Sequence, residues 1–123
     1  MTKEDRQLLL IDISARLSYS VIGRHREKDE YIATITPEGA FQNRSYNGWF
    51  DIETFKPYLR SMSNMTKTEY EEYTDIKESA SNILGRYKQI DKFDWLNSHH
   101  FDYRGLIEKN LAIEVDEDDN PYK

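Results

Sequence analysis

The densest group of reactive side chains in this sequence of 123 residues lies between positions 99 and 104. His99, His100 and Asp102 are residue types that ligate metal ions or transfer protons. Neighbouring positions on a helix point about 100° apart, so these histidines would not converge on one ion as histidines four residues apart do. We therefore interpret the run as a helix end in which Phe101 and Tyr103 are buried and Asp102 either pairs with Arg104 or caps the next helix. A metal site is the alternative.

A second group of residues has the composition of a surface that binds nucleic acid. Cationic side chains alternate with tyrosines over the first half of the chain, and cations bind phosphates while aromatic rings stack on bases. The candidate residues are Arg24, Arg26, Lys28 and Arg44. Acidic neighbours at positions 27, 29 and 30 reduce the positive potential of this group. We therefore favour a solvated strand face and keep nucleic-acid binding as the alternative.

Aromatic residues are abundant, with nine tyrosines, five phenylalanines and two tryptophans. Tyr46 and Trp49 flank an Asn-Gly turn signal, where a side chain has little core to enter. Large aromatic side chains supply much of the binding energy of protein interfaces. Tyr46 and Trp49 are thus candidate protein-binding residues, and packing across a small core is the alternative.

Several kinds of chemistry lack their sequence signals. The absence of cysteine excludes disulfides, thiol catalysis and cysteine-ligated metal centres. No nucleophile elbow and no phosphate-binding glycine loop is present, since the five glycines are scattered. These observations predict a noncatalytic protein without a cofactor or metal. The longest apolar run, Leu8–Ile11, is far shorter than the 18 or so residues of a membrane span, so we expect a soluble cytoplasmic protein with no membrane partner.

The elements that would position these residues begin with a helix over 3–17, introduced by a capping box of Thr2 and Asp5. Apolar residues at helical spacing form one stripe of this helix, and Asp12 and Arg16 are expected in solvent. Short runs rich in β-branched and aromatic residues follow, separated by turn residues. The predicted strands are 21–26, 31–36, 40–44 and 49–52, with a polar loop over 27–30.

The second half of the chain reads as mainly helical. Thr66 and Glu69 form another capping box, and helical spacing continues to about 88 with a break near Gly85. A short helix near 93–99, a helical turn over 103–109 that ends at Asn110, and an edge strand over 111–115 complete the chain.

The sequence thus predicts one α+β domain over 1–113: a helix over 1–19, a small curled antiparallel sheet over 20–63, and C-terminal helices over 66–113. We expect the sheet to close into a barrel of Src-homology-3-like character, because closure removes exposed edges. Residues 114–123 carry five acids and one lysine, giving −4 of the net charge of −6. Such an acidic tail is expected to stay solvated and disordered.

Three phrases of the sequence are familiar when taken together: residues 1–6, residues 55–66 and residues 94–109. They resemble a family of small uncharacterised proteins of Bacteroides-type gut bacteria and of their phages and mobile elements. The chain departs from the family pattern at Asn110, where relatives tend to have glycine. The resemblance implies a bacterial or phage origin and carries no reaction, cofactor or site residue.

These observations favour a noncatalytic protein-interaction module, an accessory factor of a phage or mobile element whose partner is another protein. A nucleic-acid-binding accessory protein that uses Arg24 to Arg44 is the alternative. A metal-dependent hydrolase built on His99, His100 and Asp102 ranks third.

Overall fold

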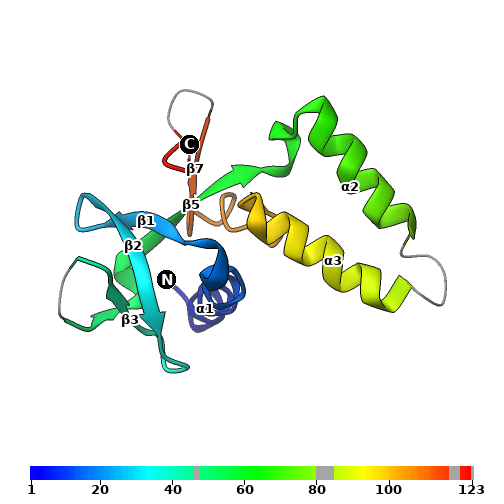
Figure 1. Ribbon diagram of the computed structural model, residues 1–123. Helices are drawn as coiled ribbons and strands as arrows, with labels where there is room; N and C mark the ends of the chain where they lie inside the picture. Colours follow the sequence, from blue (N-terminus) through cyan, green and yellow to red (C-terminus); the bar gives the residue numbers. More distant parts are fainter. Residues whose placement is uncertain (46–47, 80–84, 117–119, 123) are drawn as a thin grey trace.

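The fold is α+β, with an N-terminal helix set against an open sheet (Figure 1). The computed structural model spans residues 1–123 and describes residues 1–45, 48–79, 85–116 and 120–122. For residues 77–79 and 85–91 it describes the backbone alone. No helix in these ranges has both the length and the apolar character needed to cross a bilayer.

Helix α1 (Lys3–Arg16) begins as predicted. The Thr2 hydroxyl accepts a hydrogen bond from the Asp5 amide at 3.0 Å, and the Asp5 carboxylate accepts one from the Thr2 amide at 3.4 Å. The stripe of α1 that contains Leu9 and Ile13 is fully buried. A short 3₁₀ turn, η1 (Leu17–Tyr19), then leads into the sheet.

The sheet is a seven-stranded arrangement whose main path runs β4-β3-β2-β1-β5-β6. Antiparallel pairs join β1 to β2, β2 to β3, β3 to β4 and β1 to β5. The two-residue strands β6 and β7 both pair with β5 in parallel. The strands are β1 (Ile22–His25), β2 (Lys28–Ile35), β3 (Ala40–Asn43), β4 (Phe50–Asp51), β5 (Phe55–Ser61), β6 (Phe101–Asp102) and β7 (Ile113–Glu114).

The sheet remains open, so its predicted closure into a barrel is not observed. Strands β4 and β6 lie at opposite ends of the path and do not pair with each other in the described part of the chain. One face instead packs on α1, and residues after β6 add to the same core. A sheet that buries one face against other elements can remain open, because its apolar side chains are removed from water without closure.

The first hairpin turn differs from the predicted polar loop over 27–30. The turn consists of Arg26 and Glu27 alone, with φ angles of 51° and 68°, and β2 already begins at Lys28. Two-residue turns with positive φ at both positions match the twist of paired strands but normally use asparagine or glycine. Arginine and glutamate give no such signal, so sequence reasoning placed the turn too late.

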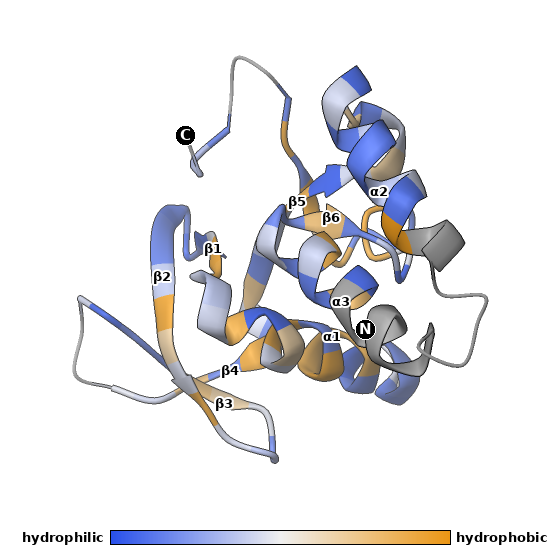
Figure 2. Cartoon of the chain, turned by 45° about the vertical axis from the view of Figure 1, so that its right-hand side comes forward, coloured by the Kyte–Doolittle hydropathy of each residue, from blue (hydrophilic) through white to orange (hydrophobic). Residues whose placement is uncertain are grey.

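Two apolar clusters stabilise the molecule. The larger joins α1, the inner face of the sheet and the segment after β6, and it includes Leu9, Phe41, Phe55 and Leu106. The smaller lies on the other face of β1 and β5, where Ile22 and Tyr58 pack with Val115 and Tyr122. In Figure 2 the hydrophobic colour is concentrated on α1 and the strands around it.

Two further 3₁₀ turns, η2 (Ile52–Thr54) and η3 (Met62–Asn64), flank β5. Helices α2 (Lys67–Ser79) and α3 (Gly85–Ser98) lie side by side and extend away from the strands on one side of the molecule (Figure 1). Their connection, residues 80–84, lies outside the described residues. Residues 106–110 form turns instead of the predicted helix, and Asn110 ends them with a φ of 60°.

Candidate functional site

The residues of the predicted metal or proton-transfer cluster have separate structural partners. His99 Nδ1 lies 2.9 Å from the Trp95 carbonyl oxygen and donates to it, and its ring stacks on Trp95 with centroids 4.1 Å apart. His100 stacks instead on Tyr122 at 3.5 Å. The Asp102 carboxylate accepts hydrogen bonds from two amides of the following turn, at 3.0 and 2.9 Å. Asp102 is therefore a cap, one of the two roles expected for it.

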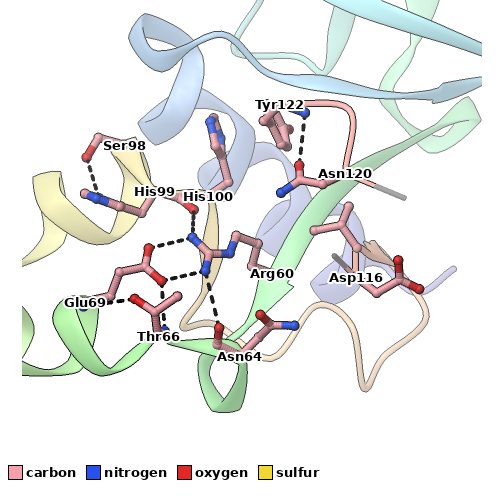
Figure 3. Close-up of a pocket in the computed structure, with 11 residues that line it drawn as sticks. Arg60, Asn64, Thr66, Glu69, Ser98, His99, His100, Asp116, Asn120 and Tyr122 are labelled. Carbon is pink, nitrogen blue, oxygen red and sulfur yellow. Dashed lines mark hydrogen bonds and ion pairs between the residues drawn. The ribbon is translucent and has the colours of Figure 1, made fainter. Parts of the chain in front are cut away.

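These residues do not form a metal centre. No group of three or more histidine, aspartate or glutamate side chains within the described ranges is placed to hold an ion. The two histidines instead border a pocket of about 430 Å³ between the end of β5, the start of α2 and the C-terminal segment, which we name the tail pocket (Figure 3).

The charged groups of the tail pocket are largely committed to the fold. Arg60 donates to both carboxylate oxygens of Glu69 at 2.7 and 2.8 Å and also to the Asn64 carbonyl at 3.3 Å (Figure 3). The hydrogen bond from Arg60 lowers the pKa of Glu69 to about 2, although burial opposes this shift. Burial, followed by the charge of Arg16, lowers the pKa of His100 to about 4. Because Arg60 and Glu69 already pair with each other, they leave few hydrogen-bonding groups for a ligand.

The four candidate nucleic-acid residues do not share one surface. Directly opposed residues of antiparallel strands lie on the same face. Arg24 opposes Asp29 and Lys56 on the outer face, whereas Lys28 opposes His25, whose other neighbour is the core residue Phe55. These cations are thus divided between the two faces of the sheet.

The other two of the four lie outside the strands, although Arg26 borders one pocket with Arg24 and another with Lys28. Arg26 is in the turn between β1 and β2, and Arg44 stacks its guanidinium over the Tyr31 ring at 4.8 Å. These four residues therefore do not form a continuous basic face of the sheet, which binding of a phosphate backbone would require. They are Arg24, Arg26, Lys28 and Arg44.

Of the two candidate protein-binding aromatics, Trp49 is described and Tyr46 lies outside the described residues. Trp49 immediately precedes β4 and is 56% exposed. Its neighbour Phe50 turns inward, where it contacts the His25 ring at 4.5 Å. Trp49 thus stands in solvent beside the end strand of the sheet.

A second pocket lies where β1, the first hairpin turn and β2 approach β3 and β4. Its volume is about 270 Å³, and we name it the turn pocket. It is lined by His25, Arg26, Lys28, Glu30, Asn43 and Phe50. The Arg26 guanidinium lies over the Phe50 ring at 5.0 Å. Neither Arg26 nor Lys28 forms an ion pair with any residue that the structure describes.

Sequence reasoning missed His25 and Asn43 as members of this pocket. Both are buried polar residues on strands that also bear core residues. The alternation of β1 contains the signal for His25, because it lies two residues after the buried Gly23 and thus on the same face. The alternation of β3 contains the same signal for Asn43, because it lies two residues after the buried Phe41.

A scan against protein-family models and searches of curated proteins and of solved structures found no significant match to this chain. The function must therefore be argued from the geometry alone.

Proposed function

We propose that this chain is a noncatalytic protein-interaction module that binds an extended segment of a partner protein at the outer edge of β4, with Trp49 as the anchor. The observation that carries the proposal is the 56% exposure of Trp49 at the position directly before β4. Tryptophan is enriched among the residues that dominate binding energy at interfaces.

The edge itself supports the proposal. β4 is the last strand of the sheet path, and its pairing with β3 occupies one side of it. No strand pairs with its other side in the described part of the chain, so an added strand can hydrogen-bond there, although the Asp51 carbonyl already accepts from the Thr54 hydroxyl at 2.7 Å. A two-residue strand offers few such bonds, so an adjacent side-chain anchor is needed for affinity and specificity.

The proposal retains two expectations of the sequence. The first is Src-homology-3-like character, in the sense that a small curled sheet presents aromatic side chains to a peptide. The second is an accessory role in a phage or mobile element of Bacteroides-type bacteria.

The test compares two exposed aromatics in a binding assay. Immobilised wild type, Trp49→Ala and Tyr70→Ala proteins are incubated with nuclease-treated bacterial lysate; Tyr70, on α2, is 61% exposed and serves as the matched control. We expect a protein that wild type and Tyr70→Ala retain equally and that Trp49→Ala binds at least about tenfold more weakly. Equal retention by Trp49→Ala would contradict the proposal.

Nucleic-acid binding is the second candidate, and one observation favours it. Arg24, Arg26 and Lys56 together border an outer pocket of about 380 Å³. Salt-dependent retention on DNA or RNA that is lost when Arg24 and Arg26 are replaced by glutamate would support this candidate. No retention at low salt would exclude it.

A further inference from the structure

A tyrosine from the end of the chain fills a gap at the junction of β1 and β5. The backbone pairing of these strands ends with Gly23 opposite Pro57, and one position further Ile22 would face Tyr58. The Tyr122 hydroxyl lies in the place of this pair. It accepts from the Ile22 amide at 3.2 Å, and the Ile22 and Tyr58 carbonyl oxygens lie 3.0 and 2.9 Å from it and share its hydrogen. The hydroxyl thus satisfies backbone groups at the point where the two strands separate.

The ring of Tyr122 is held as specifically as its hydroxyl. It packs on an apolar cluster of Ile22, Tyr58 and Val115. The His100 ring stacks on it with centroids 3.5 Å apart and an angle of 8° between the planes (Figure 3). We name the surroundings of the ring, formed by Ile22, Tyr58, His100 and Val115, the tyrosine socket. It recognises a phenol by apolar packing, by stacking and by hydrogen bonds.

A single side chain holds the end of the chain in this socket. Among residues 120–122, Tyr122 alone forms hydrogen bonds to described residues outside this segment, because the Asn120 side chain accepts from the Tyr122 amide at 3.0 Å. A tyrosine from another chain therefore has to displace only one side chain.

The socket continues into the tail pocket, which Tyr122 and His100 also line. The volume of this pocket, about 430 Å³, falls in the range of about 300–1,000 Å³ typical of ligand pockets and gives room for a residue next to an incoming tyrosine. Arg60 and Glu69 neutralise each other there, and Asp116 adds a carboxylate to the lining. The pocket therefore disfavours an acidic neighbour and suits a polar, uncharged one.

We propose that the tyrosine socket binds a tyrosine in an extended segment of a partner protein, and that Tyr122 occupies the socket as a competing ligand within the chain. The socket lies on β1 and β5, away from β4 at the end of the sheet path, so this inference goes beyond the proposed function. A second copy would bring the same tail and gain no new contact for the entropy lost on association, which favours a different partner.

The experiment opens the socket with Tyr122→Ala in the full chain and uses N-acetyl-tyrosine amide as the probe, while NMR follows the His100 ring. We expect a saturable shift with a Kd in the millimolar range. Binding to wild type should be at least about tenfold weaker, because Tyr122 competes. N-acetyl-phenylalanine amide should bind Tyr122→Ala at least about tenfold more weakly than the tyrosine probe, because it leaves backbone groups of Ile22 and Tyr58 unpaired.

Two blocked tripeptides test the residues beside the tyrosine. Gln-Tyr-Gln is expected to bind Tyr122→Ala severalfold more tightly than N-acetyl-tyrosine amide, and Glu-Tyr-Glu more weakly than Gln-Tyr-Gln. Equal binding of all three would show that the tail pocket takes no part and would refute an extended segment.

Further variants separate binding from a purely structural role. Tyr70→Ala, which removes an exposed tyrosine of α2, is the matched control and should bind the probe as weakly as wild type does. The Tm of Tyr122→Ala is expected to fall and to recover as the probe fills the socket. Tyr122→Phe keeps the ring in place and loses only the hydroxyl, so it should admit the tyrosine probe more readily than wild type even if Tyr122→Ala does not fold.

Several outcomes would overturn the proposal. They are the absence of a His100 shift in both Tyr122 variants, equal binding of the tyrosine and phenylalanine probes, and equal binding to wild type and Tyr122→Ala. A wild-type dimer that Tyr122→Ala abolishes would assign the socket to a second copy instead.

The socket and the β4 edge can fail separately. A silent socket together with Trp49-dependent retention of a partner would refute the socket alone. Probe binding at the socket without any Trp49-dependent partner would refute the role of the β4 edge alone.

Discussion

Asp12 is the residue on which most of the buried charge of this protein depends. Its fully buried carboxylate accepts from Arg16 at 2.9 and 3.0 Å and from Arg104 at 2.7 Å. Arg16, only 1% exposed, lies with its guanidinium 5.1 Å from the centre of the Tyr103 ring. The expectation that Asp12 and Arg16 stay in solvent is therefore wrong. Their spacing of four residues matches a helical ion pair, and this was the available signal.

We predict that Asp12→Ala lowers the free energy of unfolding by about 3–5 kcal/mol, because two arginines then lose their buried counter-charge. Urea denaturation followed by circular dichroism measures this change. Glu38→Gln, on the exposed β2–β3 turn, is the control and should change stability by less than about 0.5 kcal/mol. A loss of similar size in both variants would show that the Asp12 pairs contribute little.

At the scale of elements, the contact between β1 and β5 requires a glycine. Gly23 opposes Pro57 across the pair, and a Cβ at Gly23 would overlap the Lys56 carbonyl oxygen and the Phe55 ring. A backbone carbonyl in a paired strand cannot move away as a flexible side chain can. The close approach of these two strands brings His25 beside Phe55.

Gly23→Ala is accordingly expected to destabilise the protein by about 1–3 kcal/mol, the usual range for overpacking a filled core. Amide hydrogen exchange should also speed up at the β1–β5 pairs more than in α1. Ala33→Ser, at an exposed position of β2, is the matched small change and is expected to leave both measurements unaltered. If amide hydrogen exchange at the β1–β5 pairs is unchanged in Gly23→Ala, the two strands can move apart without loss of stability, and a glycine is not required at this position.

At the scale of the whole molecule, the C-terminal segment ties back to the first strand. The Tyr122 hydroxyl lies 3.0 Å from the Ile22 carbonyl and 2.9 Å from the Tyr58 carbonyl, and it accepts from the Ile22 amide at 3.2 Å. Its ring stacks on His100. The expected solvated tail is thus wrong at Tyr122, while residues 117–119 lie outside the described residues. The apolar ring, and not the acidic composition around it, directs this contact.

The burial of His100 is expected to make stability depend on pH. Burial, together with the charges of Arg16, His99 and Arg60, lowers the pKa of His100 from 6.5 to about 4. Between these values the unfolded chain binds more protons than the folded chain, so stability is complete above about pH 6.5 and falls as the pH drops to about 4. Glu69, with a pKa of about 2 in the fold against 4.5 ordinarily, adds a separate loss at lower pH, between about 4.5 and 2.

We predict that His100→Asn reduces the loss of stability between pH 6.5 and 4. Asparagine tolerates the φ of 64° at this position and does not titrate. Urea midpoints measured at half-unit pH steps give the comparison, and the lower transition assigned to Glu69 should remain. If wild type and His100→Asn follow the same curve above pH 4.5, the burial of His100 has no part in the pH dependence.

Local patterns were sufficient for α1 and its Thr2 cap and for the approximate positions of β1 to β4, and they gave the cap formed by Asp102 as one of two options. Each of these features depends on interactions between residues a few positions apart, which spacing and residue type express directly.

Features that join distant segments were beyond such patterns. Whether the sheet closes depends on what else covers its apolar face, and the burial of Asp12 depends on Arg104, which is 92 positions away. The turn pocket likewise combines residues of β1, β2, β3 and β4, whose register no local pattern specifies. These outcomes follow from the balance of burial and charge pairing across the whole chain, and that balance is established when the segments pack together.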